Sequence, residues 1–89
     1  MRIVQSPQFK KAYKRLHKNQ QHDLEPAILA ILGAPDIGVL KIGDLAGARV
    51  YKFRMVNQLM LLAYRLSYEG TELELIAVGP HENFYRDIK

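Results

Sequence analysis

The chain has 89 residues, contains no cysteine and carries a formal net charge of +4. This length supports one domain, residues 1–89, with a modest core, and a hydrophobic content of 48% is that of a folded protein. The lack of cysteine excludes disulfides, thiolate zinc sites and a cysteine nucleophile. No apolar run approaches the roughly 18 residues that a membrane helix needs, and the amino terminus lacks the apolar stretch of a signal peptide. We therefore expect a soluble cytoplasmic protein with no membrane association.

The first third of the chain predicts a strand and a pair of helices. Residues 2–5 favour a strand, and Ser6-Pro7 is typical of a helix start. Residues 18–20 are polar and predict a turn, after which Asp23 is the expected cap of a second helix that ends at Gly33. Each helix carries apolar residues at helical spacing, which are Phe9, Ala12, Tyr13 and Leu16 in the first and Leu24, Ala27, Ile28, Ile31 and Leu32 in the second. The two helices form a hairpin with one apolar side, which must pack on another element.

Positive charge is concentrated on the first predicted helix. Lys10 and Lys14 lie among five cations between residues 10 and 18, on the face opposite the apolar stripe. Two readings stay open, because such a face either is only solvated or contacts nucleic acid.

The second half of the chain predicts a small antiparallel sheet. Residues 50–56 alternate, with Tyr51, Phe53 and Met55 on one face, and residues 57–58 suit a tight hairpin. Residues 59–66 are apolar on both faces, which indicates a central covered strand. In the last strand the pattern places Leu73, Leu75 and Ala77 on one face and Glu72, Glu74, Ile76 and Val78 on the other. A short additional strand fits residues 39–41. The expected fold class is α+β, in the order β-α-α-β-β-β with one optional further strand, and the helical hairpin covers one face of the mainly antiparallel sheet.

Several polar residues of this sheet are candidates for contact with a polyanion. Lys52 and Arg54 are two apart on a strand, so they share a face, and a phosphate group fits both; ordinary solvent exposure is the alternative reading. Arg65 interrupts an apolar strand, where an unpaired charge is costly, so it must reach solvent, a carboxylate such as Glu72 or Glu74, or a ligand phosphate.

The carboxy-terminal segment adds titratable groups. His81, Tyr85 and Arg86 follow the Gly79-Pro80 exit of the last strand. Cleavage of RNA by its own 2′-hydroxyl requires a base, an acid and cations that stabilise the crowded phosphate. His81 and Tyr85 suit the proton transfers, while Lys52, Arg54, Arg65 and Arg86 suit the phosphate. No metal-ligand spacing is evident, and we expect neither a metal nor a cofactor.

The chain resembles the RelE/ParE superfamily of bacterial toxins from type II toxin–antitoxin systems. The resemblance lies in the order and spacing of short stretches, namely residues 6–11, 45–47, 51–54, 63–66 and 78–85. It implies the same β-α-α-β-β-β fold and, for the RelE-like branch, metal-independent cleavage of mRNA on the ribosome. By position, His81, Tyr85, Arg65 and Arg54 match catalytic positions of that branch, and Lys52 completes its basic pair. Related RNases often carry an arginine where this chain has Leu59 and Met60.

The resemblance leaves the activity open. ParE-like members share the fold but poison DNA gyrase, and a third reading is an inactive module that binds an antitoxin. The resemblance implies a cognate antitoxin as partner, within a toxin–antitoxin hetero-oligomer able to bind operator DNA through the antitoxin. Leu59, Leu61 and Leu62 predict apolar surface beyond the reach of two small helices, which an antitoxin segment would cover.

Overall fold

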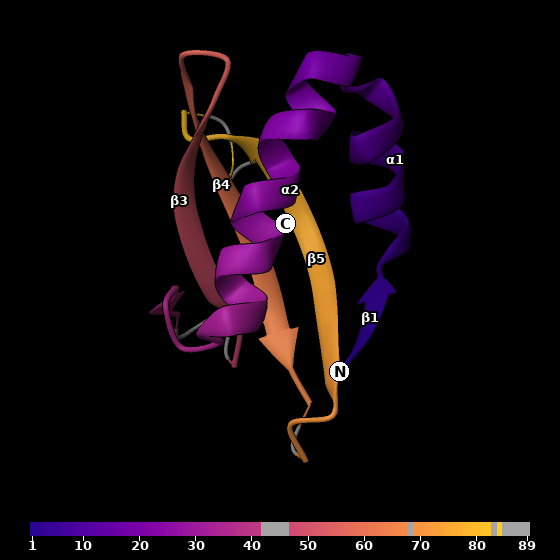
Figure 1. Cartoon of the computed structure of the whole chain (residues 1–89), viewed down its shortest axis with the longest axis vertical. Helices are drawn as coiled ribbons and strands as arrows, with labels where there is room; N and C mark the ends of the chain where they lie inside the picture. Colours follow the sequence, from indigo (N-terminus) through magenta and orange to yellow (C-terminus); the bar gives the residue numbers. More distant parts are fainter. Residues whose placement is uncertain (42–46, 68, 83, 85–89) are drawn as a thin grey trace.

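Two helices lie on one face of a five-stranded sheet (Figure 1). The computed structural model describes residues 1–41, 47–67, 69–82 and 84. In chain order the elements are β1 (Arg2–Gln5), α1 (Pro7–Arg15), α2 (Lys18–Gly33), β2 (Val39–Leu40), β3 (Arg49–Met55), β4 (Gln58–Leu66) and β5 (Glu72–Pro80). The strand order is β1-β5-β4-β3-β2, with β1 parallel to β5 and the other pairs antiparallel. The predicted α+β class, the helical hairpin on one face and the mainly antiparallel sheet are therefore confirmed.

The start of α1 ties the helix layer to the sheet. The Ser6 hydroxyl accepts a hydrogen bond from the Phe9 backbone N–H at 3.0 Å and donates one to the Ile76 carbonyl at 2.6 Å. Pro7 occupies the first helical position, where its missing N–H costs nothing. The predicted helix start is confirmed, and the same serine fixes the end of β1 beside β5.

The predicted start of α2 was wrong by six residues, because the cap of the helix is His17 and not Asp23. The helix begins at Lys18, and the residues expected to form a turn make its first turn. Polar side chains organise this start: the Gln20 carboxamide oxygen accepts from the His17 backbone N–H at 2.8 Å, and the Gln21 amide donates to the carbonyls of Tyr13 and Leu16. Asp23 lies inside the helix. No described helix is long and apolar enough to cross a membrane.

The core lies between the helices and the sheet. We call the covered side of the sheet the inner face, and its strand residues alternate with those of the opposite side as predicted for β3. Phe9, Leu24 and Ile31 from the helices meet inner-face residues of the strands, which are Met55, Met60, Leu62, Tyr64, Leu73, Leu75 and Val78. Central β4 is buried from Met60 to Tyr64, which confirms the prediction of a strand covered on both faces.

Tyr64 is a buried polar group of this core with complete hydrogen bonding. Its hydroxyl donates to the Pro35 carbonyl at 2.6 Å and accepts from the Gly38 N–H at 2.9 Å, which fastens the segment after α2 to the sheet. Burial raises the pKa of the Tyr64 phenol above its ordinary value of 10.0. Residue 38 must be glycine here, because a Cβ atom would lie 2.8 Å from the Tyr64 hydroxyl oxygen.

The β3–β4 hairpin turns one residue earlier than predicted. Met55 pairs with Gln58, so the two turn residues are Val56 and Asn57, with φ of 48° and 68°. Positive φ at both turn residues gives the turn a twist that matches the twist of the two flanking strands, and Asn tolerates this conformation. A β-branched residue does not, because its side chain crowds the backbone in this conformation. The Asp23 carboxylate on α2 accepts from the Val56 N–H at 2.8 Å and supports the turn.

The alternation predicted for β5 fails beyond Leu75. Ala63 pairs with Ala77 while the next residue, Tyr64, pairs with Leu75, so Ile76 is an extra residue in β5 and forms a bulge. Leu73, Leu75 and Val78 belong to the inner face, whereas Ile76 and Ala77 both pack on the other side. The predicted placement of Ala77 and Val78 was therefore wrong, because one unpaired residue inverts the alternation of everything after it.

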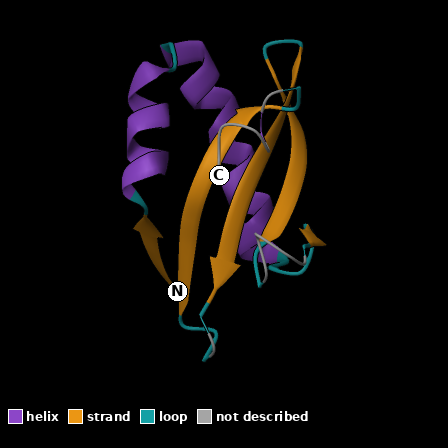
Figure 2. Ribbon diagram, turned by 180° about the vertical axis from the view of Figure 1, so that it is seen from behind, coloured by secondary structure: helices purple, strands orange, loops and turns teal. Residues whose placement is uncertain are grey.

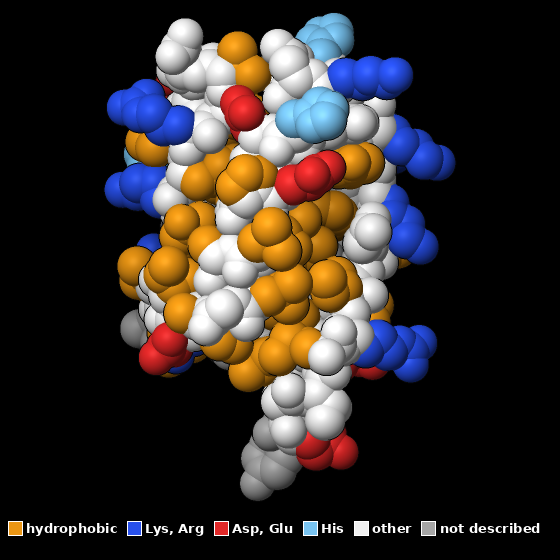
Figure 3. Space-filling view, viewed as in Figure 1, with side chains coloured by type: hydrophobic (Ala, Val, Ile, Leu, Met, Phe, Trp, Pro, Cys, Tyr) orange, Lys and Arg blue, Asp and Glu red, His pale blue; other side chains and the backbone are white. Residues whose placement is uncertain are grey.

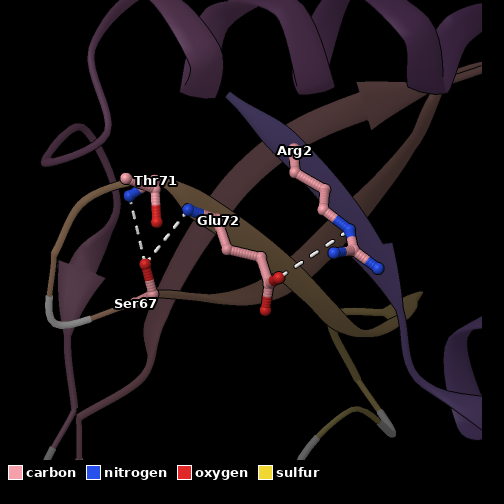
Figure 4. A network of polar contacts seen from close by, with 4 residues as sticks. All are labelled: Arg2, Ser67, Thr71 and Glu72. Carbon is pink, nitrogen blue, oxygen red and sulfur yellow. Dashed lines mark hydrogen bonds and ion pairs between the residues drawn. The ribbon is translucent and has the colours of Figure 1, made fainter.

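Polar contacts join residues of the β4–β5 turn, and one links β1 to the start of β5 (Figure 4). The Ser67 hydroxyl accepts from the backbone N–H groups of Thr71 and Glu72 at 3.1 and 3.0 Å. Arg2 of β1 forms an exposed ion pair with Glu72 at 3.8 Å. These contacts fix the β4–β5 turn and hold the parallel edge strand β1 in register.

Candidate functional site

The second side of the sheet, which we call the outer face, is covered by neither α1 nor α2 (Figure 2). Its floor consists of small and medium apolar residues, which are Val50, Leu61, Ala63 and Ala77. Phe84 packs on this floor with 3% of its surface exposed, and a Cβ atom at Gly79 would lie 3.7 Å from its ring. Leu61 and Leu62 are buried, so the apolar surface predicted for them is absent; only Leu59 of the three stays half-buried.

The outer face brings together three of the predicted site residues. Arg54 pairs with Leu59 across the β3–β4 ladder, and the His81 backbone N–H donates to the Leu59 carbonyl at 3.0 Å. Arg54 and His81 therefore flank Leu59 in one row, two strand spacings or about 10 Å apart. Lys52 lies in the next row, opposite Leu61. The side chains of Lys52 and Arg54 are exposed, as is that of His81. The outer face thus presents cations that suit a phosphate group, and an imidazole that can transfer a proton lies in the same row.

An open cavity of about 420 Å³ marks this place. Lys52, Leu61 and His81 line it, together with Val39 and Lys41 from the neighbouring edge. Lys41 was missed as a site residue by the sequence reasoning. The signal that would have found it is the predicted short strand at residues 39–41, because pairing of that strand with β3 places Lys41 opposite Ala48, at the same cavity as Lys52.

Arg65 does not join this group. It lies on the outer face near the end of β4, six residues beyond Leu59 and so roughly 20 Å from the row of Arg54 and His81. Its guanidinium forms a half-exposed ion pair with Glu74 at 3.4 Å. Of the alternatives expected for Arg65, the structure shows the carboxylate partner, and among the described site residues Arg65 lies apart from Arg54 and His81.

The remaining predicted residues lie elsewhere. Lys10 and Lys14 are exposed on α1, in the helix layer, where Lys and Arg side chains line one edge of the molecule (Figure 3). Tyr85 and Arg86 lie outside the described residues. Buried Phe84 precedes Tyr85 directly in the chain.

The described part of the outer face offers cations and an imidazole. Among the described residues, no group of three or more His, Asp or Glu side chains is placed to hold a metal ion. Lys52 and Arg54 present positive charge on one face, which suits contact with a phosphate group. His81 supplies a group able to accept or donate a proton.

Comparisons with known proteins agree with this architecture. The family described as "ParE-like toxin of type II bacterial toxin-antitoxin system" matches residues 3–89. A mutant of the Escherichia coli toxin RelE in the free state matches with a TM-score of 0.73 and 17% identity, over 98% of this chain and 87% of that chain. The intact E. coli RelBE toxin–antitoxin complex gives 0.70 and 19% identity, over 89% and 94%. The RelBE2 toxin–antitoxin complex of Mycobacterium tuberculosis gives 0.56 and 15%, over 90% and 96%. No curated protein matches the sequence.

Proposed function

Because the chain belongs to the ParE-like toxin family of type II bacterial toxin–antitoxin systems, we propose that it is an endoribonuclease that cleaves translated mRNA on the ribosome without a metal ion. The observation that carries this proposal is the row formed by Arg54, Leu59 and His81, with Lys52 beside it. A gyrase poison needs no proton-transfer group beside a phosphate site, whereas an RNase does. The fold shared with RelE supports the same branch.

In the proposed reaction the 2′-hydroxyl of one nucleotide attacks the adjacent phosphate and expels the 5′-oxygen of the next. Lys52 and Arg54 bind the non-bridging phosphate oxygens and stabilise the charge that grows on them. His81 transfers a proton at one of the two oxygens, the attacking or the leaving one. We propose Tyr85 for the second transfer and Arg86 as a further phosphate contact. Arg65 has no role in this scheme, because its place on β4 is too distant.

An antitoxin is the proposed protein partner. The E. coli RelBE and M. tuberculosis RelBE2 structures are toxin–antitoxin complexes of proteins with this fold, which supports a corresponding complex here. The net charge of +4 favours an antitoxin segment with acidic residues. A toxin that acts on translating ribosomes would work in the cytoplasm.

The decisive experiment is induced expression in a bacterial host, followed by mapping of mRNA 5′ ends. We expect new ends within translated codons, and we expect them to disappear in His81→Ala. His22→Ala is the matched control, because His22 is an exposed histidine of α2 in the helix layer. Intact transcripts in arrested cells, together with double-strand DNA breaks and an SOS response, would replace this proposal with gyrase poisoning. That alternative is favoured by Leu59, an apolar residue where related RNases often carry an arginine.

A further inference from the structure

The bulge in β5 has a consequence for the outer face. Side chains of a regular strand alternate between faces, so two positions whose numbers differ by an even amount share a face unless a bulge lies between them. Leu75 belongs to the inner face. Counting regularly from Leu75 places residues 77, 79 and 81 on the inner face as well.

The structure has the opposite arrangement. Ala77 packs with the outer-face floor, and a side chain at Gly79 would meet the ring of Phe84, which packs on that floor too. His81 lines the outer-face cavity with Lys52 and Leu61. The change of face occurs at Ile76, the one residue between Leu73 and Pro80 without a partner in β4.

We infer that the bulge at Ile76 positions His81. The extra residue turns the end of β5, so that His81 faces the same side as Lys52 and Arg54. The inverted alternation depends on the presence of one extra residue in β5, so the kind of side chain at position 76 matters less than the residue itself. Ile76 is only half-buried, and it packs at the margin of the floor. The Ser6 hydroxyl binds the carbonyl of Ile76 at 2.6 Å, which holds the bulge at the point where β1 ends.

The number of residues in β5 and the identity of residue 76 can be changed independently of each other. Ile76→Ala keeps the residue number and should retain mRNA cleavage within about threefold, since it trims one half-buried side chain. Deletion of Ile76 should remove the bulge and turn His81 away from Arg54. Insertion of one alanine between Pro80 and His81 should turn His81 away as well, and it leaves every paired residue of β5 in place. The deletion and the insertion together should restore the original face.

The chain has no cysteine, so the geometry can be read without any activity. We would introduce Arg54→Cys and His81→Cys and apply a thiol cross-linker of about 10 Å, the separation of two strand spacings. Cross-linking is expected at least tenfold faster in the otherwise unchanged chain and in the deletion-plus-insertion variant than in either single variant. Thermal unfolding of each variant would show whether it is folded.

A folded insertion variant that cross-links as fast as the unchanged chain would overturn the inference, and this variant decides alone if the deletion prevents folding. The role of His81 in cleavage rests on the proposed function, whereas its orientation does not. Toxicity that survives His81→Ala would therefore refute the RNase proposal and leave the cross-linking result standing. Cleavage that requires His81 but persists in the insertion variant would refute the positioning role alone.

Discussion

The inner and outer faces of the sheet come from the same three long strands, but their composition differs. On the inner face, β4 presents Met60, Leu62 and Tyr64 to the helices, and all three are at most 3% exposed. On the outer face the same strand presents Leu59, Leu61 and Ala63, and the neighbouring strand adds Lys52 and Arg54. The inner-face side chains thus bury against a second layer, while leucine, alanine and two exposed cations share the outer face.

The inner face therefore carries most of the stability of the fold, and the outer face carries the residues of the proposed reaction. Burial of large apolar side chains stabilises the fold, whereas two adjacent exposed cations contribute little to it and repel each other. Changes on the inner face should therefore unfold the protein, and changes of outer-face charge should spare the fold while removing function.

The largest loss of stability is expected from Leu62→Ala. Leu62 is fully buried between sheet and helices, so its truncation should lower the free energy of unfolding by about 2–5 kcal/mol. Leu59→Ala is the matched control, since it removes the same atoms from a half-buried outer-face position of the same strand, and it should cost clearly less. Urea denaturation of both variants measures the two costs. Equal losses would show that the two faces do not differ as described.

A smaller loss is expected from Tyr64→Phe. This change leaves the Gly38 N–H and the Pro35 carbonyl without the hydroxyl that binds them. An unsatisfied buried polar group costs about 1–3 kcal/mol, which urea denaturation would detect. Tyr51→Phe is the control, because its half-buried phenol has no such pair of bonds in the described structure. A Tyr64→Phe variant as stable as the parent would show that the segment after α2 is not held by this hydroxyl.

The same tyrosine predicts a pH dependence. Burial raises the pKa of Tyr64 in the folded protein, so the unfolded chain loses this proton first as the pH increases. The contribution of the protonated Tyr64 phenol to the free energy of unfolding is complete below the unfolded pKa of 10.0. It is lost as the pH rises from there through the folded pKa. We expect the free energy of unfolding to fall less between pH 9.5 and pH 11 in Tyr64→Phe than in the parent, where the two pH values are about half a unit below and one unit above the ordinary phenol pKa. Parallel pH curves would contradict the raised pKa.

The sequence predicted the layers of this fold because local patterns determine them. The Ser6-Pro7 helix start and the alternation of Tyr51, Phe53 and Met55 both appear in the structure. The start of α2 was missed because side-chain to backbone bonds of Gln20 and Gln21 establish it, and these leave no apolar periodicity. The bulge at Ile76 was missed because it depends on pairing with β4, a partner distant in sequence.

The sequence predicted which residue types form the candidate site, but only in part which of these residues lie close together. Lys52 and Arg54 share a face through strand periodicity alone. Their neighbourhood with His81 requires the strand order β5-β4-β3 and the bulge, neither of which a local pattern contains. Arg65 was grouped with them because its side chain is a cation, but it lies near the end of β4, far along the strand from Leu59.

A modest gain in stability is expected at the hairpin from Val56→Asn. Val56 has φ of 48° and is 47% exposed, so it bears backbone strain with little burial in return. Asn tolerates this conformation, and relief of the strain should stabilise the protein by about 1 kcal/mol. Asn57→Gly, at the neighbouring position with φ of 68°, should change stability by a few tenths of a kcal/mol at most. A loss of stability in Val56→Asn would show that the valine side chain makes a stabilising contact.

The smallest change in stability, with a large change in binding, is expected from Lys52→Ala combined with Arg54→Ala. Both side chains are exposed, so the free energy of unfolding should stay within about 0.5 kcal/mol. If both bind phosphates of single-stranded RNA, the slope of log affinity against log salt should fall by about 1.4. Lys10→Ala with Lys14→Ala removes the same charge from the helix layer and should change that slope much less. Equal changes of the slope in the two variants would mean that RNA affinity depends on total charge and not on the outer face. The two faces would then differ in stability but not in RNA binding.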